Sequence, residues 1–249
     1  MTNGHKLTVS HYYLGKKDAI LGTKERKERE REQRREHIIK VSEVFFLNKS
    51  IDAVTMDEIA AECELSKGTL YIYFKSKEEI YLTIICRALS LLYGMFKEAV
   101  SKSGDPAGKL RTMGEAFITF YERYPGYYKL MVKLHDHQMF LKMDIKEVTG
   151  EILVQIGDIF SIMYEIIEEG KNIGLFKDNT NPAEVAISLW SVSTMFIGLI
   201  DHMETFDHTG VDIKYLPFKD LNMKSLLILN GKRVIYSILK NPPPDFDAM

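Results

Sequence analysis

The sequence predicts an all-α protein with about nine helices, and three observations lead to this fold class. Apolar residues recur at helical spacing along most of the 249 residues, as Met56, Ile59 and Ala60 do. No stretch shows the regular alternation of apolar and polar residues that marks a half-buried strand. Capping residues, prolines and glycines separate the periodic segments. We therefore expect a small three-helix N-terminal domain followed by a larger helical domain.

The predicted domain limits follow from where the periodic segments begin and end. We expect an N-terminal extension at residues 1–22, a first domain at 23–75, a second helical domain at 76–241 and a tail at 242–249. Within the first domain, one helix is expected from about Thr23 to Leu47. Its first half is highly charged and its second half is apolar on one face.

Two short helices joined by a tight turn are predicted between Thr55 and Lys75. Thr55 and Glu58 have the spacing of a capping box, in which each residue caps the other at a helix N-terminus. Cys63 to Leu65 form the connection. Ser66 is a second N-cap candidate, and the second helix is expected from Lys67 to Phe74. The pattern is that of a helix-turn-helix.

The second of these helices has an unusual composition for a core element. It is barely two turns long and carries hydroxyl groups, aromatic rings and a lysine. Such a helix suits the major groove of DNA, which admits an α-helix and is read through hydrogen bonds and methyl contacts. Gly68 has no side chain, so a phosphate could approach the backbone closely there.

The same residues resemble the DNA-binding domain of the TetR family of transcriptional regulators. The resemblance spans roughly Arg35 to Ile85 and rests on many residue types at fixed spacing: Thr55, Ile59-Ala60, Leu65 to Tyr71, Tyr73-Phe74 and Ser76 to Glu78. One departure is Glu64, where the family usually has a glycine in the turn. We expect Glu64 to adopt a left-handed backbone conformation, which costs roughly 1 kcal/mol for a residue other than glycine. The residues expected to contact DNA are Thr55, Ser66, Lys67, Gly68, Thr69, Tyr71, Tyr73, Phe74, Lys75 and Lys77.

Charge is distributed unevenly around this motif. The net charge of the chain is −2, but basic residues exceed acidic ones in residues 1–50 and acidic residues exceed basic ones in residues 51–80. The mixed run from Lys24 to Glu36 has two interpretations, a solvated helix face or a helix that also contacts phosphates. Residues 1–22 likewise have several interpretations: a loosely ordered extension, a basic arm that reaches DNA, or a segment with a structural role at an interface.

The remainder of the chain is expected to form long helices. Ser76 and Glu79 suggest a cap at the start of one, and Asp105-Pro106 and Asn181-Pro182 have the pattern of an N-cap followed by proline at the first helical position. The expected helices run from Lys77 to about Val100, from Pro106 to about Tyr124, from Gly126 onward, from Asp144 to Glu169 with Gly170 as C-cap, from Pro182 over about 24 residues, and from Phe218 to Leu239.

Aromatic residues and methionines are concentrated in the middle helices. Most of them are expected to be core residues, but such side chains can also enclose an apolar pocket with a few polar groups. The TetR resemblance implies a pocket of this kind that binds a small apolar or amphipathic effector. The candidate ligand-binding residues are Phe117, Tyr121, Tyr128, Met131 and His135.

A homodimer is expected for two reasons. A palindromic operator requires two reading helices roughly 34–36 Å apart, and the last two long helices carry more apolar surface than one small domain needs. The TetR resemblance implies that these helices pair in a four-helix interface. The residues expected at that interface are Trp190, Phe196, Leu227 and Val234.

Other functional classes have little support in the sequence. No metalloprotease, nucleophile-elbow, phosphate-loop or dinucleotide motif occurs, so we expect neither an enzyme nor a cofactor. His135 and His137 are two apart and would point to opposite sides of a helix, so we expect no metal site. Two cysteines, Cys63 and Cys86, fit a reducing compartment. No apolar run suggests a membrane span, and a cytoplasmic location is expected.

The function that the sequence predicts is a ligand-responsive transcriptional regulator that binds double-stranded operator DNA as a homodimer. Repression is the outcome that the resemblance implies. The alternative is an interaction protein with the same fold that binds a protein partner, because the reading helix is flanked by acidic Glu62 and Glu64. Steep weakening with salt distinguishes DNA binding from this alternative.

Overall fold

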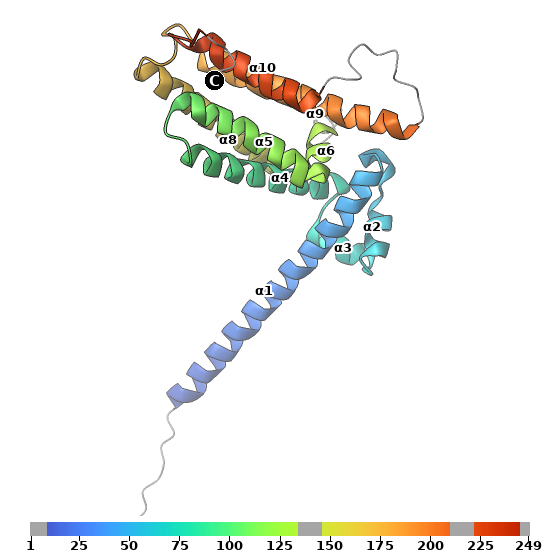
Figure 1. Ribbon diagram of the computed structural model, residues 1–249. Coiled ribbons are helices and arrows are strands. Elements are labelled where there is room, and N and C mark those ends of the chain that lie inside the picture. The colour runs from blue at the N-terminus through green and yellow to red at the C-terminus, as the bar shows by residue number, and fades with distance from the viewer. Residues whose placement is uncertain (1–8, 134–145, 210–221, 245–249) are drawn as a thin grey trace, which may run out of the picture. The chain divides into compact units, whose positions relative to one another are not determined.

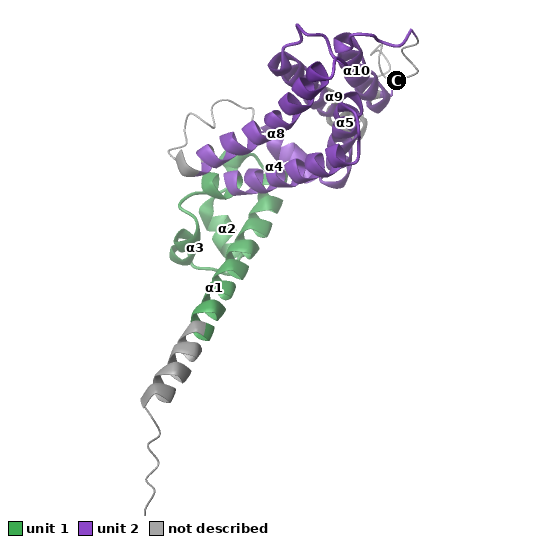
Figure 2. Cartoon of the chain, turned by 90° about the vertical axis from the view of Figure 1, so that its left-hand side faces the viewer, with its two compact units in different colours: residues 1–81 green, residues 82–249 purple. Residues whose placement is uncertain are grey.

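The computed structural model describes residues 9–133, 146–209 and 222–244. These residues form nine α-helices and one short 3₁₀ helix without any strand, so the predicted all-α fold is confirmed (Figure 1). The chain divides into two compact units, residues 1–81 and residues 82–249 (Figure 2). The dividing point lies within α4 (Lys77–Ser101), whereas our domain limits placed it just before that helix.

The first unit is built on α1 (Val9–Asn48), which is longer than the helix we expected from Thr23. After α1 come the 3₁₀ helix η1 (Ile51–Ala53), α2 (Met56–Glu62), α3 (Lys67–Tyr73) and the start of α4. The described side chains of α1 before Arg35 are exposed, and burial begins at Ile38. The charged half of α1 therefore lies outside the core, as predicted.

Apolar side chains from α1, α2, α3 and the start of α4 form one small core. The largest of them, Phe46 of α1 and Tyr81 of α4, pack edge to face with ring centroids 5.2 Å apart. The Ser42 hydroxyl of α1 is buried and donates to the Ile38 carbonyl at 2.8 Å. The other core residues include Ile38, Ile39, Val54, Ile59, Leu70 and Phe74.

The second unit contains the rest of α4 and five further helices. They are α5 (Pro106–Arg123), α6 (Pro125–Lys133), α8 (Lys146–Asn172), α9 (Pro182–Thr209) and α10 (Met223–Ile238). The N-terminus of α5 has the predicted form, because the Asp105 carboxylate accepts from the Gly108 N–H at 2.9 Å and Pro106 follows it. In this unit α10 lies along α9, and α5 packs against α8 and α10 (Figure 1).

The end of α8 differs from our expectation at Gly170. The helix continues to Asn172, and Gly174, not Gly170, has the left-handed conformation with φ 73°. Gly170 has a different role, because a Cβ there would lie 2.1 Å from the Phe176 ring. Phe176 is fully buried, and its N–H donates to the Gly170 carbonyl at 3.0 Å. Gly170 is therefore required for close packing.

Two described helices are long and apolar enough to cross a membrane by length and composition alone. In α4, 56% of the apolar window is buried inside the protein, as in the core helix of a folded domain. The corresponding window of α9, residues 182–199, is only 24% buried. Ile187, Met195 and Leu199 are exposed there, by 57%, 65% and 38%. Length and apolar composition are weak evidence of a membrane span, but α9 does present an uncovered apolar face.

Candidate functional site

The N-terminus of α2 is closed by a reciprocal cap. The Glu58 N–H donates to Thr55 Oγ1 at 3.2 Å, and the Glu58 carboxylate accepts from the Thr55 N–H at 2.9 Å. Lys49 Nζ donates to the same carboxylate at 2.8 Å. The bond from Lys49, followed by those from Thr55, lowers the pKa of Glu58 to about 2. The predicted capping box is confirmed, and the Thr55 hydroxyl is used within the protein.

The turn between α2 and α3 depends on an unusual backbone conformation at Glu64. Its φ is 54°, the only positive φ of a non-glycine residue in the part of the chain described. The Glu64 N–H donates to the Ala61 carbonyl at 3.0 Å, and the Leu65 N–H donates to the Ala60 carbonyl at 2.8 Å. These two bonds end α2 and redirect the chain into α3. The expected left-handed conformation at Glu64 is confirmed.

α3 has one fully buried side chain, and most of its other residues are exposed. Leu70 is fully buried, and the Ser66 side chain caps the helix by accepting from the Thr69 N–H at 3.1 Å. Thr69 is half-buried. The exposed residues of α3 and its cap are Ser66, Lys67, Gly68, Tyr71 and Ile72.

Ile72 was missed by our sequence reasoning, although its side chain is 69% exposed. Its position could have been found from helical spacing, because Lys67, Gly68, Tyr71 and Ile72 stand at i, i+1, i+4 and i+5 and so share one face. This face combines a cation, a bare backbone, a phenol and an apolar side chain. Such a set can contact phosphates, base edges and thymine methyl groups.

One expected contact was wrong, because Phe74 is only 1% exposed and cannot reach a ligand outside the protein. The Arg35 guanidinium lies 5.0 Å from the centre of its ring. Lys77 also acts inside the first unit, since its Nζ donates to the carbonyls of Asp52 at 3.1 Å and Val54 at 2.8 Å. It fixes the chain just before α2.

The remaining predicted contacts differ in exposure. Lys67 is exposed, and its Nζ pairs with Asp57 of α2 at 2.7 Å, which raises the pKa of Lys67. Lys75 is exposed just beyond α3, and Tyr73 is half-buried. Lys67, Tyr71 and Lys75 are thus the predicted side chains with the freest access to solvent.

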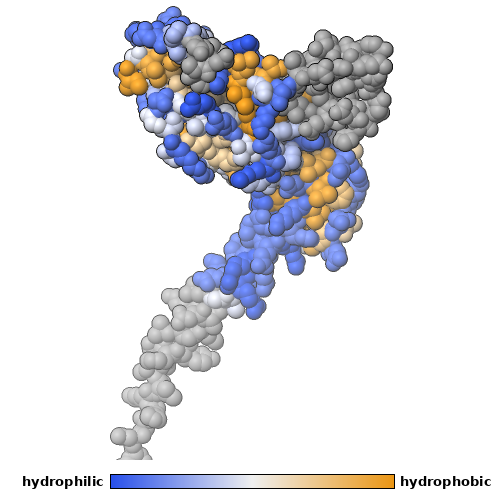
Figure 3. Space-filling model, viewed as in Figure 1, coloured by the Kyte–Doolittle hydropathy of each residue, from blue (hydrophilic) through white to orange (hydrophobic). Residues whose placement is uncertain are grey.

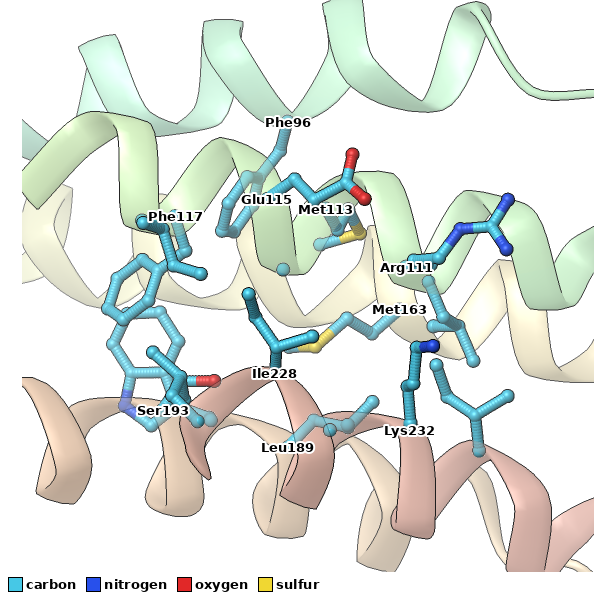
Figure 4. Close-up of a pocket in the computed structure, with 17 residues that line it drawn as sticks. Phe96, Arg111, Met113, Glu115, Phe117, Met163, Leu189, Ser193, Ile228 and Lys232 are labelled. Carbon is cyan, nitrogen blue, oxygen red and sulfur yellow. The ribbon is translucent and has the colours of Figure 1, made fainter. Parts of the chain in front are cut away.

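The second unit contains an apolar cavity of about 120 Å³ between α4, α5, α8, α9 and α10 (Figure 4). An engineered apolar cavity of about 150 Å³ binds benzene, so a ring or a short carbon chain matches this volume. Its polar lining consists of Arg111, Glu115, Ser193 and Lys232. The apolar lining includes Phe96, Met113, Phe117, Met163, Leu189 and Trp190.

Two cations lie on the rim of this cavity, and sequence reasoning missed both. Arg111 of α5 and Lys232 of α10 lie toward one end in Figure 4, with Phe117 and Ser193 toward the other. Within the described residues, neither cation has an ion-pair or hydrogen-bond partner. They are far apart in the sequence, so only the packing of α10 against α5 reveals them as one group.

The predicted ligand-binding residues are only partly on this cavity. Phe117 lines it, and the Tyr128 ring packs edge to face on Phe117 and Tyr121, with centroids 6.2 and 5.2 Å away. The Tyr128 hydroxyl donates to the Thr194 carbonyl at 2.9 Å, so this phenol joins α6 to α9. Met131 is a buried residue, and His135 lies outside the described residues.

The predicted interface residues occupy varied positions. The Trp190 ring packs on Phe117 and Phe160, with centroids 5.5 and 5.8 Å apart, and Trp190 and Leu227 line the cavity of their own chain. Val234 is half-buried on α10, and the Phe196 side chain is outside the described part of the structure. The exposed apolar residues of α9 are instead Ile187, Met195 and Leu199.

Comparison with known proteins identifies the N-terminal motif. The family described as bacterial regulatory proteins, tetR family, matches residues 38–84, which include α2, the turn and α3. Residues 38–84 therefore resemble the DNA-binding domain of the tetR family. Among curated proteins, the HTH-type transcriptional activator FasR of Mycolicibacterium smegmatis is 33% identical over 101 residues, covering 41% of this chain and 46% of FasR. The HTH-type transcriptional repressor KstR2 of the same organism is 27% identical over 77 residues, 31% of this chain and 38% of KstR2.

The chain matches less than half the length of these curated relatives, but solved structures extend the likeness of fold. AibR in complex with isovaleryl coenzyme A and operator DNA has a TM-score of 0.58 at 17% identity, covering 84% of this chain and 99% of AibR. FadR of Bacillus subtilis in complex with stearoyl-CoA has a TM-score of 0.59 at 16% identity, covering 81% and 98%. At these identities the likeness establishes the fold of both units.

Metal binding has no candidate in the described part of the chain. No group of three or more histidine, cysteine or carboxylate side chains gathers there. His135 and His137, the pair considered from the sequence, fall in a segment that the structure does not describe. Cys63 and Cys86 are buried as separate thiols.

Proposed function

We propose that this chain is a transcriptional regulator that reads operator DNA with the exposed face of α3. The observation that carries the proposal is the combination of a capped, solvent-facing helix with a match to the tetR family over its whole motif. Lys67 supplies a phosphate contact, Tyr71 a hydrogen bond, and Ile72 an apolar contact to a thymine methyl group. Such a function is exercised in the cytoplasm, where operator DNA lies.

The proposed regulator acts as a homodimer on a palindromic operator. The exposed apolar face of α9, with Ile187, Met195 and Leu199, supports this part of the proposal because burial against a second copy would remove it from water. Two copies related by a two-fold axis present two α3 helices, and successive major grooves lie roughly 34–36 Å apart. α10, which packs along α9, would complete the interface.

The proposed effector is an amphipathic molecule with a short apolar part and an anionic group. The cavity volume of about 120 Å³ supports a short chain or single ring, and the unpartnered Arg111 and Lys232 support an anion at the rim. Burying an acyl chain of about five carbons would contribute on the order of 3–4 kcal/mol. The CoA thioesters in the AibR and FadR complexes have this combination of apolar and anionic parts.

The dimer is released from DNA if the effector binds more tightly to a conformation in which the distance between the two α3 helices no longer matches successive major grooves. A tenfold fall in operator affinity requires about 1.4 kcal/mol of difference in effector binding between the two states. We propose repression as the regulatory outcome. The named relatives include both an activator, FasR, and a repressor, KstR2.

Fluorescence anisotropy with a duplex selected from a random pool tests the DNA-binding part. Tyr71→Ala and Ile72→Ala should each weaken binding about five- to 150-fold, the range for losing 1–3 kcal/mol at a base contact. Val44→Ala is the matched control, because Val44 is also exposed and apolar but lies on the side of α1 away from the core. Equal affinities for all three variants and the unmodified chain would refute the assigned reading face.

Calorimetry tests the effector part. Arg111→Gln combined with Lys232→Gln should weaken binding of hexanoate or a short acyl-CoA at least tenfold while leaving binding of neutral hexanol unchanged. The neutral ligand controls for damage to the cavity. Equal losses for both ligand classes would show that the two cations only support the fold.

If the fold instead serves a protein partner, as in our alternative, the reading face would still be exposed but binding would not depend on a duplex. The acidic Glu62 and Glu64 next to α3 are the feature that favours this second candidate. A slope near zero in a plot of log affinity against log salt would support it, since phosphate contacts give a steep negative slope.

A further inference from the structure

The charged half of α1 is sorted by helical position. With 3.6 residues per turn, the cations Lys24, Lys27, Arg31 and Arg34 fall three, four and three residues apart and share one face, which we call the basic stripe. The carboxylates of Glu25, Glu28, Glu32 and Glu36 share another face. A run that looks evenly mixed in the sequence thus has two surfaces of opposite charge. In Figure 3 the described part of this helix is hydrophilic on the face shown.

The basic stripe faces the side of α1 on which α2 and α3 pack. Arg31 and Lys24 precede the buried Ile38 by one and two heptads, and Glu32 and Glu25 precede the buried Ile39 by the same intervals. The core side of α1 therefore continues between the two charged faces, and the contact of Arg34 decides which of them lies toward the turn. Arg34 lines a hollow with Cys63, Glu64 and Leu65 of the turn.

A second contact locates the boundary between the two charged faces. Arg35, the next residue along, places its guanidinium 5.0 Å from the ring centre of Phe74, directly after α3. Arg35 lies four residues after Arg31 of the stripe and seven after Glu28 of the carboxylate face, so Phe74 lies near the boundary between the two faces, and the hollow at Arg34 places the turn on the side of the stripe. α1 therefore carries its cations past the end of the helix-turn-helix on the side of the reading helix.

The four cations of the stripe are exposed and unpaired. Within the described residues, none of them forms an ion pair or side-chain hydrogen bond. The neighbouring Arg26 does pair, with Glu30 at 3.4 Å, but both lie off the stripe. An unpaired row of cations is the local feature on which affinity for phosphates depends, whatever the net charge of the chain.

We propose that the basic stripe of α1 binds the phosphates of DNA that flanks the sequence read by α3. From Arg34 to Lys24 the helix rises about 15 Å, which corresponds to about four phosphates of one strand at 3.4 Å each along the duplex axis. The stripe lengthens the footprint and adds affinity that is independent of sequence. This inference rests on the proposed DNA-binding function.

Two double variants of equal charge change test the stripe in the full chain. Lys27→Gln with Arg31→Gln removes two stripe cations, whereas Arg26→Gln with Arg29→Gln removes two cations from the other side of the same helix turn. All four side chains are exposed, so neither variant should lower the melting temperature. Operator affinity is measured from about 0.05 to 0.3 M salt, the range over which phosphate binding weakens steeply. Two duplexes are compared: one is trimmed to the selected site, and the other is extended at each end by about ten base pairs, which is one helical turn.

The expected result is a difference between the doubles. The slope of log affinity against log salt on the extended duplex should become shallower by about 1.8 in the stripe double, since each phosphate that is no longer neutralised changes the slope by about 0.9. This slope should stay unchanged in the control variant, Arg26→Gln with Arg29→Gln. The unmodified chain should bind the extended duplex more tightly than the trimmed one, and the stripe double should lose that preference.

Three results would overturn the inference, and they are distinguishable. Equal slopes for the two doubles, with normal operator binding by the unmodified chain, would remove the stripe contact alone. A change in sedimentation of the stripe double with an unchanged salt slope would assign the stripe to a protein contact. Failure of the unmodified chain to bind any selected duplex would remove the proposed function, and the stripe's role with it.

Discussion

Replacing Glu64 by glycine should stabilise the turn between α2 and α3. A non-glycine residue at φ 54° costs about 1–2 kcal/mol relative to the right-handed region. Glycine removes that cost but gives up about 0.5–1 kcal/mol, because it has more freedom in the unfolded chain. The net expectation for Glu64→Gly is a gain of about 0.5–1 kcal/mol.

Native-state hydrogen exchange measures this gain where it acts. The N–H groups of Leu70 and Phe74 donate to the carbonyls of Ser66 and Leu70 at 3.0 and 3.1 Å, so they report opening of α3. Both should exchange about two- to fivefold more slowly in Glu64→Gly, the factor that corresponds to 0.5–1 kcal/mol.

Glu64→Gln separates backbone strain from charge, because it removes the carboxylate and keeps a side chain on the left-handed backbone. Exchange at Leu70 and Phe74 should therefore be nearly unchanged in this variant. Equal slowing in Glu64→Gly and Glu64→Gln would show that charge repulsion destabilises the turn. Faster exchange in Glu64→Gly would refute the strain argument directly.

Three further predictions concern single sites. Gly170→Ala should destabilise the second unit by about 1–3 kcal/mol in urea unfolding because its Cβ would overlap the Phe176 ring, whereas Gly157→Ala, with open space around the new Cβ, should not. The folded-state pKa of Glu58 is lowered from 4.5 to about 2, so the stability that its carboxylate contributes is present above pH 4.5 and is lost as the pH falls toward 2. When unfolding is measured at a series of pH values, the free energy of unfolding of Glu58→Gln should therefore lie below that of the unmodified chain near neutral pH and approach it in acid. Burial raises the pKa of the Cys86 thiol to about 12, so it should react with a thiol reagent at neutral pH only after denaturant is added.

The features that sequence reasoning predicted correctly are local ones. The caps at Thr55, Ser66 and Asp105 each need only a side chain and a backbone N–H three residues away, so spacing alone identifies them. The left-handed turn at Glu64 was expected from the TetR resemblance, because the family usually has a glycine at this position. The helix-turn-helix was therefore predictable almost to the residue.

The features that were missed depend on contacts between distant segments. Nothing near Phe74 in the sequence reveals that its ring is buried beneath Arg35, or that Lys77 holds two carbonyl groups before α2. Arg111 and Lys232 come to line the same cavity only because α10 packs against α5.

Gly170 illustrates a third limit. The sequence indicated a helix end, and both Gly170 and Gly174 were available as the glycine that ends it. The choice depends on Phe176, which folds back onto the helix and excludes a side chain at residue 170.

Selection of the purified chain against random duplex DNA at about 0.15 M salt, where surface charges act only over about 8 Å, is the most direct test of the central claim. We expect enrichment of a palindrome whose half-sites are centred one helical turn apart, and loss of that enrichment in Tyr71→Ala. A folded, dimeric chain that enriches no sequence would contradict it.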